Sequence, residues 1–215
     1  LLKITVAFLA CLIAWRVGGK GHSASDERTF KLLFGLVFAA DVCFMVNLAP
    51  VGIVLFAVVQ GLLAKRNLKG WREALPNLGQ RRVEITGVAM AVAGALAATL
   101  YGIYALQGFT PLWFVIAAYT VFLWSSVMAA WIAPYTEVFP GPNARMMAWG
   151  MVLFLVCDLT VAGNLALPAT SLFRVVTSSL TWMFYAPALI LIATSAWRME
   201  EAKLESREGE LLTQR

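Results

Sequence analysis

Seven runs of apolar residues divide the chain, and charged residues or clusters of proline and glycine bound each of them. The runs cover residues 1–15, 31–47, 50–64, 83–106, 111–134, 146–167 and 175–197. A transmembrane helix needs about 20 predominantly apolar residues, so the runs are suited to crossing a bilayer. The pattern therefore predicts an all-α fold: a polytopic bundle of seven transmembrane helices over residues 1–197, with a tail at 198–215.

The first run is short and opens at Leu1 rather than at a methionine. We interpret it as a transmembrane segment of a chain that begins further upstream, with another helix before Leu1. A signal peptide is the alternative interpretation. The run lacks the basic start and the small-residue cleavage site that a signal peptide carries.

Lysine and arginine are divided unequally between alternate connections. Fifteen of the 17 lie in or at the border of the connections 16–30, 65–82 and 135–145 and the tail, whereas Lys3 and Arg174 lie on the other side. Cytoplasmic loops of membrane proteins carry the excess of basic residues. The basic connections and the C-terminal tail are therefore predicted to be cytoplasmic. The net charge of +5 belongs to these connections, so we expect contact with anionic lipid and no nucleic-acid partner.

Composition narrows the class of protein further. The chain is 60% hydrophobic and 13% charged, with a mean hydropathy of +0.76, whereas soluble domains are about 25% charged. A large extramembrane catalytic domain and a disordered chain are thereby excluded. All three cysteines lie in apolar runs and His22 is the one histidine. We therefore expect no disulfide framework, no metal site, no cofactor and no serine-hydrolase triad.

Small residues recur along one stretch of the run 83–106. Gly87, Ala91, Gly94 and Ala98 have the spacing that lets membrane helices approach closely. This stretch is predicted to be a packing face rather than a site.

Two acidic residues, Asp41 and Asp158, lie inside apolar runs. An aspartate at the centre of a bilayer costs about 2.5–3.5 kcal/mol, so it marks a functional site or else a polar contact that fixes helix packing. Asp41 lies ten residues beyond Lys31 and Asp158 thirteen beyond Arg145, which places them at depths that differ by roughly 5 Å. Each is followed six positions later by an asparagine, Asn47 or Asn164, as in a weak internal repeat.

Two neighbouring carboxylates in a low dielectric cannot both ionise cheaply, so we expect at least one to hold its proton near neutral pH. A carboxylic acid beside a carboxylate suits acid-catalysed cleavage of an ether-type bond. The pair suits proton relay in a transporter equally well. The residues alone leave these two alternatives open.

Three stretches resemble motifs of the YhhN family of membrane proteins. The stretch 150–164, GMVLFLVCDLTVAGN, is similar to the family's G-x-x-x-F-x-x-S-D-x-x-x-A-x-N element, with Cys157 at the serine position. The stretch 52–60, GIVLFAVVQ, resembles G-x-x-x-F-x-x-x-H, with Gln60 in place of histidine. The stretch 35–41, GLVFAAD, is similar to G-L-x-F-S-x-x-G-D but is two residues shorter and has Ala40 before the acid.

Two further positions match the family less closely. Lys3 resembles the lysine that opens the family's second helix. Phe184 and Tyr185, followed by Leu189 and Ile190, resemble the last-helix pattern Y-Y-x-x-Q-x-L-I, with Ala188 in place of glutamine.

The resemblance implies an eight-helix bundle that hydrolyses the vinyl ether bond of a lysoplasmalogen, a lysophospholipid, to a fatty aldehyde and a glycerophospho-base. It implies that Asp41 and Asp158 are catalytic, one as the acid and the other as cation stabiliser or water activator. Substrate-binding roles fall to Lys3, at the phosphate, and to the residues that orient water or the head group: Asn47, Gln60, Asn164 and Tyr185. Interhelical hydrogen bonds are the alternative for these four, and snorkelling is the alternative for Lys3. A proton-coupled carrier and a non-catalytic membrane protein remain the alternative functions.

Overall fold

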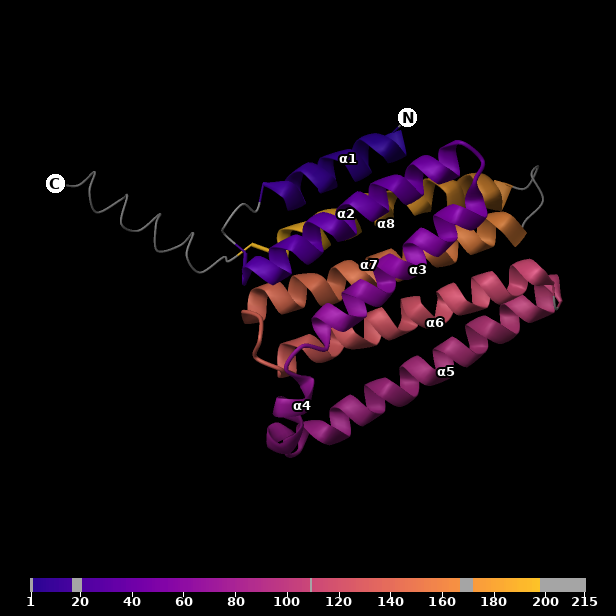
Figure 1. The fold of residues 1–215 in the computed structure, drawn as a ribbon. Helices are drawn as coiled ribbons and strands as arrows, with labels where there is room; N and C mark the ends of the chain where they lie inside the picture. The colour runs from indigo at the N-terminus through magenta and orange to yellow at the C-terminus, as the bar shows by residue number, and fades with distance from the viewer. Residues whose placement is uncertain (1, 17–20, 109, 167–171, 198–215) are drawn as a thin grey trace.

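The structure, a computed structural model, describes residues 2–16, 21–108, 110–166 and 172–197 (Figure 1). In this part of the chain the regular elements are helices, and one isolated bridge joins Gly21 and Trp197. The long helices are α1 (Leu2–Trp15), α2 (Ala24–Met45), α3 (Ala49–Asn67), α5 (Arg81–Gln107), α6 (Pro111–Ile132), α7 (Gly141–Ala166) and α8 (Leu172–Thr194). The short helix α4 (Trp71–Ala74) and 3₁₀ turns at Leu75–Leu78 and Ala133–Tyr135 join them. The predicted all-α class is confirmed, and the predicted tail lies outside the described residues.

Several helices extend beyond the apolar runs that predicted them, because polar residues cap their ends. Helix α2 begins at Ala24, seven residues before the run, because the Ser23 side chain accepts a hydrogen bond of 3.1 Å from the Asp26 backbone N–H. Asp26 and Glu27 occupy its first turn, where acidic side chains favour the helix dipole. Hydropathy locates the apolar centre of such a helix and misses its charged first turns.

Four of the described helices are long and apolar enough to cross a membrane, and they correspond to α3, α5, α6 and α7. The described parts of α1 and α8 form shorter apolar helices, Ile4–Trp15 and Ser179–Thr194. Helix α2 includes five charged residues among its 22. Several helices suited to crossing a bilayer make the chain compatible with an integral membrane protein.

Six of the helices close into a ring (Figure 1). Along this ring α1 packs on α2, α2 on α3, α3 on α6, α6 on α7, α7 on α8, and α8 on α1. The main hydrophobic core is made of buried side chains from these six helices. Every helix of the six-helix ring except α1 carries a polar residue of the site described below.

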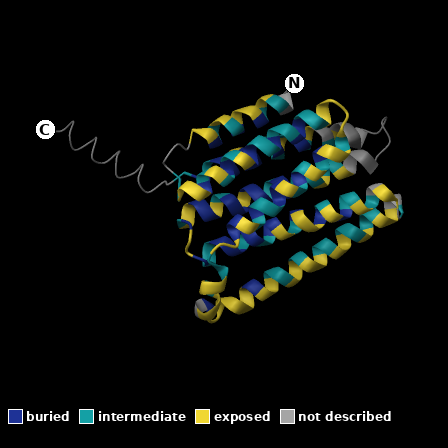
Figure 2. Ribbon diagram, in the orientation of Figure 1, coloured by how far each residue is buried: buried dark blue, intermediate teal, exposed yellow. Residues whose placement is uncertain are grey.

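Helix α5 lies outside the six-helix ring and packs on α6 (Figure 1). Only 6% of its apolar window is buried, against 39–44% for the other three spans, and Figure 2 shows it mostly exposed or half-buried. The expectation of a packing face there is wrong within this chain, since Gly87 and Gly94 are exposed and a Cβ added to either would meet nothing within 4 Å. Helices come closest elsewhere: a Cβ on Gly150 would lie 2.8 Å from Ile192 Cγ1.

A buried ion pair joins the start of α2 to the end of α3. Arg66 donates from Nε to Asp26 Oδ1 at 2.7 Å and from Nη2 to Asp26 Oδ2 at 3.0 Å. Its guanidinium lies over the rings of Phe30 and Phe139, 4.4 and 4.1 Å from their centroids, and also donates to Asn67 at 3.1 Å. The apolar pattern places Asp26 and Arg66 in the connections between helices, whereas the fold buries both side chains.

Candidate functional site

Asp41 and Asp158 lie at matching positions of two helices. Asp41 is the seventeenth residue after the start of α2, and Asp158 is the seventeenth after the start of α7. The offset in depth inferred from the sequence arises because Lys31 and Arg145, from which it was counted, lie seven and four residues after the starts of their helices. The Asp41 side chain is buried and that of Asp158 is half-buried.

Each carboxylate accepts a hydrogen bond from a tyrosine of another helix. The Tyr185 hydroxyl of α8 donates to Asp41 Oδ2, and the Tyr119 hydroxyl of α6 donates to Asp158 Oδ2. Asp158 also exerts an electrostatic effect on Tyr185, weaker than that of Asp41. Because charges are little screened in the interior of a bundle, Tyr185 is influenced by both acids.

A glutamine and a serine extend this set of polar residues toward the middle of the bundle. Ser126 Oγ donates to Gln60 Oε1 at 2.5 Å and lies 2.8 Å from the backbone oxygen of Leu123. Gln60 and Ser126 are both fully buried, and the Gln60 side chain interacts with Tyr119. We refer to the six residues Asp41, Gln60, Tyr119, Ser126, Asp158 and Tyr185 as the carboxylate–tyrosine cluster.

The Gln60 amide nitrogen is a buried donor of the cluster. Among the described residues, Nε2 meets no acceptor at hydrogen-bond geometry, although it is buried. An unsatisfied buried donor costs about 1–3 kcal/mol, and a bound water or a substrate oxygen would remove that cost. Gln60 therefore offers a donor beside the Tyr119–Asp158 hydrogen bond.

Aromatic rings hold Tyr185 in place. The centroid of its ring lies 6.1 Å from that of Phe154, which in turn lies 5.8 Å from that of Phe56. Phe44 continues the row at 6.0 Å from Phe56. Tilted and edge-to-face aromatic pairs stabilise specific ring orientations. The ring of Tyr185 is thus oriented by Phe154 of α7, which is itself supported by rings from α3 and α2.

The cluster unites some of the predicted site residues and leaves others out. Gln60 and Tyr185 join the two aspartates, whereas Asn47 is exposed in the turn after α2. Its φ of 62° is left-handed, a conformation that asparagine tolerates in turns, so the turn itself explains this residue. Lys3 lies in α1 and Asn164 in α7, and the side chains of both are outside the described part of the structure.

Sequence reasoning missed Tyr119 and Ser126. Both lie in α6, whose residues are otherwise mostly apolar. Polar side chains within a membrane span usually face the bundle interior, so this rule applied to hydroxyl residues as well as to acids would have identified them.

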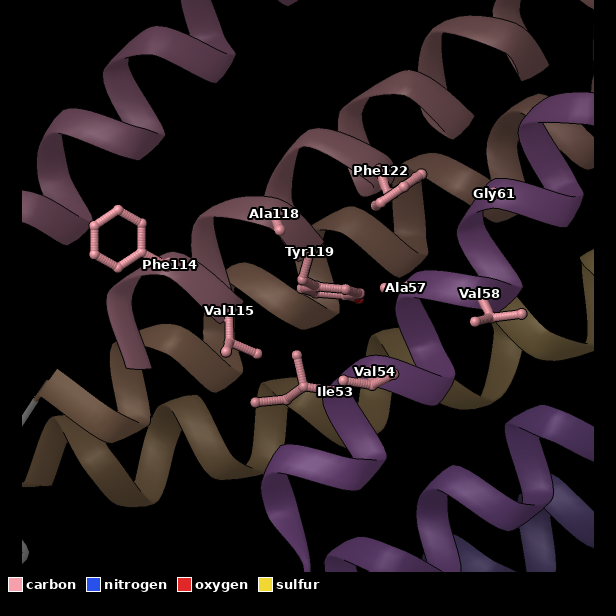
Figure 3. Close-up of a pocket in the computed structure, with 10 residues that line it drawn as sticks. All are labelled: Ile53, Val54, Ala57, Val58, Gly61, Phe114, Val115, Ala118, Tyr119 and Phe122. Atoms are coloured by element: carbon pink, nitrogen blue, oxygen red, sulfur yellow. The ribbon is translucent and has the colours of Figure 1, made fainter. Parts of the chain in front are cut away.

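The ring of Tyr119 also forms part of the wall of an apolar groove between α3 and α6 (Figure 3). Its hydroxyl connects this groove with Asp158. Within the described residues, no three His, Cys, Asp or Glu side chains converge as they would around a metal ion. The chemistry that the cluster itself can supply is proton transfer and hydrogen bonding.

No family model, curated protein sequence or solved structure matches this chain.

Proposed function

We propose that this chain is a membrane-embedded hydrolase of the YhhN type that cleaves the vinyl ether bond of lysoplasmalogen-type lipids. The observation that carries the proposal is that each of the two acids accepts a hydrogen bond from a tyrosine of another helix inside the six-helix ring. Such hydrogen bonds hold a carboxyl group in one orientation, as general acid catalysis requires.

In the proposed reaction one carboxylic acid of the pair protonates the vinyl carbon that is not bound to oxygen. The other vinyl carbon becomes an oxocarbenium ion, which the second carboxylate stabilises. Water adds to this carbon and returns its proton to the carboxylate pair. In the resulting hemiacetal the bond to the glycerol oxygen breaks, the hydroxyl gives its proton to a carboxylate of the pair, and the glycerol oxygen takes up a proton from the pair, which leaves a fatty aldehyde and a glycerophospho-base.

The remaining residues of the cluster take positioning roles. Tyr119 and Tyr185 keep the carboxylates oriented through their hydrogen bonds. The Gln60 Nε2, which meets no acceptor in the described part of the chain, is suited to bind the attacking water. Gln60 stands where the family motif has a histidine, so here the water is positioned by an uncharged amide.

The topology forms part of the same proposal. We assign seven membrane crossings, with the basic connections and the tail in the cytoplasm. The support is the bias of 15 basic residues against two. In Figure 1 the end of α1, the start of α2 and helix α4 also lie at one end of the bundle.

Cysteine labelling tests this topology. A membrane-impermeant maleimide applied outside intact cells should label Leu48→Cys and not Glu73→Cys, both at exposed positions. The reverse pattern would invert the assigned topology.

The decisive test is aldehyde release by the purified protein in lipid nanodiscs. We expect release from a vinyl-ether lysolipid and none from the matched saturated alkyl-ether lysolipid, which cannot form the oxocarbenium ion by protonation. Asp41→Asn and Asp158→Asn should each lower kcat at least a hundredfold, in the range of general acid–base catalysis. Glu84→Gln, in the exposed first turn of α5, is the matched control. A folded wild-type protein that releases no aldehyde would refute the proposal.

One observation favours a second function. Hydrogen bonds of the carboxylate–tyrosine cluster link α3, α6 and α7 in one group and α2 and α8 in another, and polar side chains inside a bundle of spans also form the proton paths of carriers. In that case liposomes containing the protein should show solute flux driven by a pH gradient, without aldehyde release. If both assays are negative and the Asp→Asn variants only destabilise the fold, the chain is a non-catalytic membrane protein.

A further inference from the structure

The groove between α3 and α6 has a volume of about 500 Å³, within the range of small-molecule sites. Its ten lining residues are five from each helix, and Figure 3 shows their side chains around the hollow. Nine of the ten are apolar, and Tyr119 is the exception. A hydrocarbon surface of this kind has no group that would bind a polar head group or an ion.

The groove opens on the outer side of the six-helix ring. Several rim residues are strongly exposed, among them Val54, Val58, Phe114 and Phe122. Both helices are long and apolar enough to cross a membrane. The medium at the mouth of the groove in a bilayer is therefore lipid and not water.

The inner wall of the groove leads to the carboxylate–tyrosine cluster. The Tyr119 ring faces the hollow (Figure 3), and its hydroxyl donates to Asp158. A molecule lying in the groove would therefore be one tyrosine ring away from a proposed catalytic acid.

The shape of the groove selects its occupant. Its lining on α3 runs from Ile53 to Gly61, a length of about 12 Å along the helix. A single hydrocarbon chain is much thinner than a transmembrane helix about 10 Å across, and lipid chains lie along the same direction as the helices.

We propose that the α3–α6 groove binds the hydrocarbon chain of a single-chain lipid and presents the ether-bearing end of that chain to Tyr119 and Asp158. This inference rests on the proposed function and adds the place where the hydrocarbon chain of the substrate binds. It also assigns Gly61, at the end of the groove lining, as a residue that limits chain length. A Cβ there would lie 3.7 Å from the Phe122 ring, which is an ordinary van der Waals contact. A larger side chain at this position would therefore occupy part of the groove.

The first experiment measures chain-length selectivity. Gly61→Leu should lower the ratio of kcat/KM for long-chain to short-chain vinyl-ether lysolipids about tenfold, the effect of excluding roughly two methylene groups. Gly94→Leu is the matched control, since it makes the same change on the exposed face of α5, with nothing within 4 Å. An unchanged ratio in Gly61→Leu, in a protein that still turns over, would overturn the inference and leave the proposed function intact.

The second experiment does not depend on turnover. A lysophospholipid with a photoreactive group at the end of its chain is bound to Asp158→Asn protein in nanodiscs, irradiated, and mapped by peptide mass spectrometry. We expect adducts on the groove-facing residues of α3 and α6, suppressed by excess single-chain lysolipid and not by diacyl phospholipid. Adducts elsewhere, equal suppression by diacyl lipid, or a second copy of the chain crosslinked in the groove would each overturn the inference. Groove adducts in a protein without hydrolase activity would uphold chain binding and refute only the proposed reaction.

Discussion

The Tyr185 hydroxyl donates a hydrogen bond to Asp41, a residue 144 positions earlier in the chain. The contact joins α8 to α2 inside the six-helix ring. Tyr185 thus orients Asp41, as Tyr119 orients Asp158. The proposed chemistry depends on these two hydrogen bonds as well as on the two aspartates.

Replacing Tyr185 with phenylalanine isolates the role of the hydroxyl, because the ring can still pack against Phe154. We expect kcat for aldehyde release to fall tenfold or more, since a hydrogen bond to a charged group contributes about 1.5–3 kcal/mol. The pH profile of kcat should also be displaced, which loss of packing alone would not cause. Tyr101→Phe, on the exposed surface of α5, should leave both unchanged. Wild-type activity and an unshifted profile in Tyr185→Phe would exclude a positioning role for its hydroxyl.

Adjacent serines of α6 provide a matched pair for testing the buried part of the cluster. Ser126→Ala leaves Gln60 Oε1 without its 2.5 Å donor in a fully buried site, so we expect a loss of about 1–3 kcal/mol in the free energy of unfolding. Ser125 is exposed and donates only to the backbone of its own helix. Its alanine variant should change stability by less than about 0.5 kcal/mol. Thermal unfolding of both variants in the same nanodiscs measures the difference, and equal effects would contradict this account of Gln60.

The Asp26–Arg66 pair should be important for stability and not for turnover. Asp26→Asn leaves a buried guanidinium uncompensated, and we expect a loss of about 3–5 kcal/mol in the free energy of unfolding. Glu27→Gln breaks the neighbouring, more exposed pair with Lys31 and should cost about 0–1 kcal/mol. Denaturant titration followed by tryptophan fluorescence distinguishes the two.

A double variant tests whether the cost comes from the unpaired charge. Asp26→Leu combined with Arg66→Met removes both charges and should recover much of the stability, because apolar pairs often replace buried ion pairs without loss. A double variant no more stable than Asp26→Asn would show that the hydrogen bonds themselves hold α2 to α3.

Glycine positions distinguish a packed helix face from an open one. Gly150→Ala would place a Cβ 2.8 Å from Ile192 Cγ1 and 3.2 Å from the backbone nitrogen of Ile192, so we expect a loss of about 1–3 kcal/mol from overpacking. Gly87→Ala meets nothing within 4 Å and should be neutral or stabilising by up to about 1 kcal/mol, the helix propensity of alanine over glycine. The thermal unfolding temperature should therefore fall in Gly150→Ala and stay the same or rise in Gly87→Ala. A greater loss in Gly87→Ala would mean that α5 has a partner in the membrane.

Hydropathy located each long helix, but it placed the ends of some helices wrongly. The spacing of small residues also predicted the wrong role for α5. The start of α2 was missed because Ser23, Asp26 and Glu27 stabilise a helix through capping and charge, which an apolar pattern does not register. The small-residue stripe of α5 was assigned to packing because spacing along a helix does not say which face meets a neighbour. Only the arrangement of all the helices shows that the stripe faces outward.

The sequence by itself determined the helical class, the positions of the apolar segments and the two acidic residues that stand out within them. These are local properties: one helix forms its own backbone hydrogen bonds, and a charge in an apolar run is conspicuous without any knowledge of its neighbours. Tertiary structure alone decided that Tyr119 and Tyr185 are the partners of Asp158 and Asp41 and that Arg66 is buried against Asp26. The partners in these contacts are 39, 144 and 40 residues apart. Such pairs meet only when helices pack together, because the rotation of each helix about its axis is fixed by packing against its neighbours.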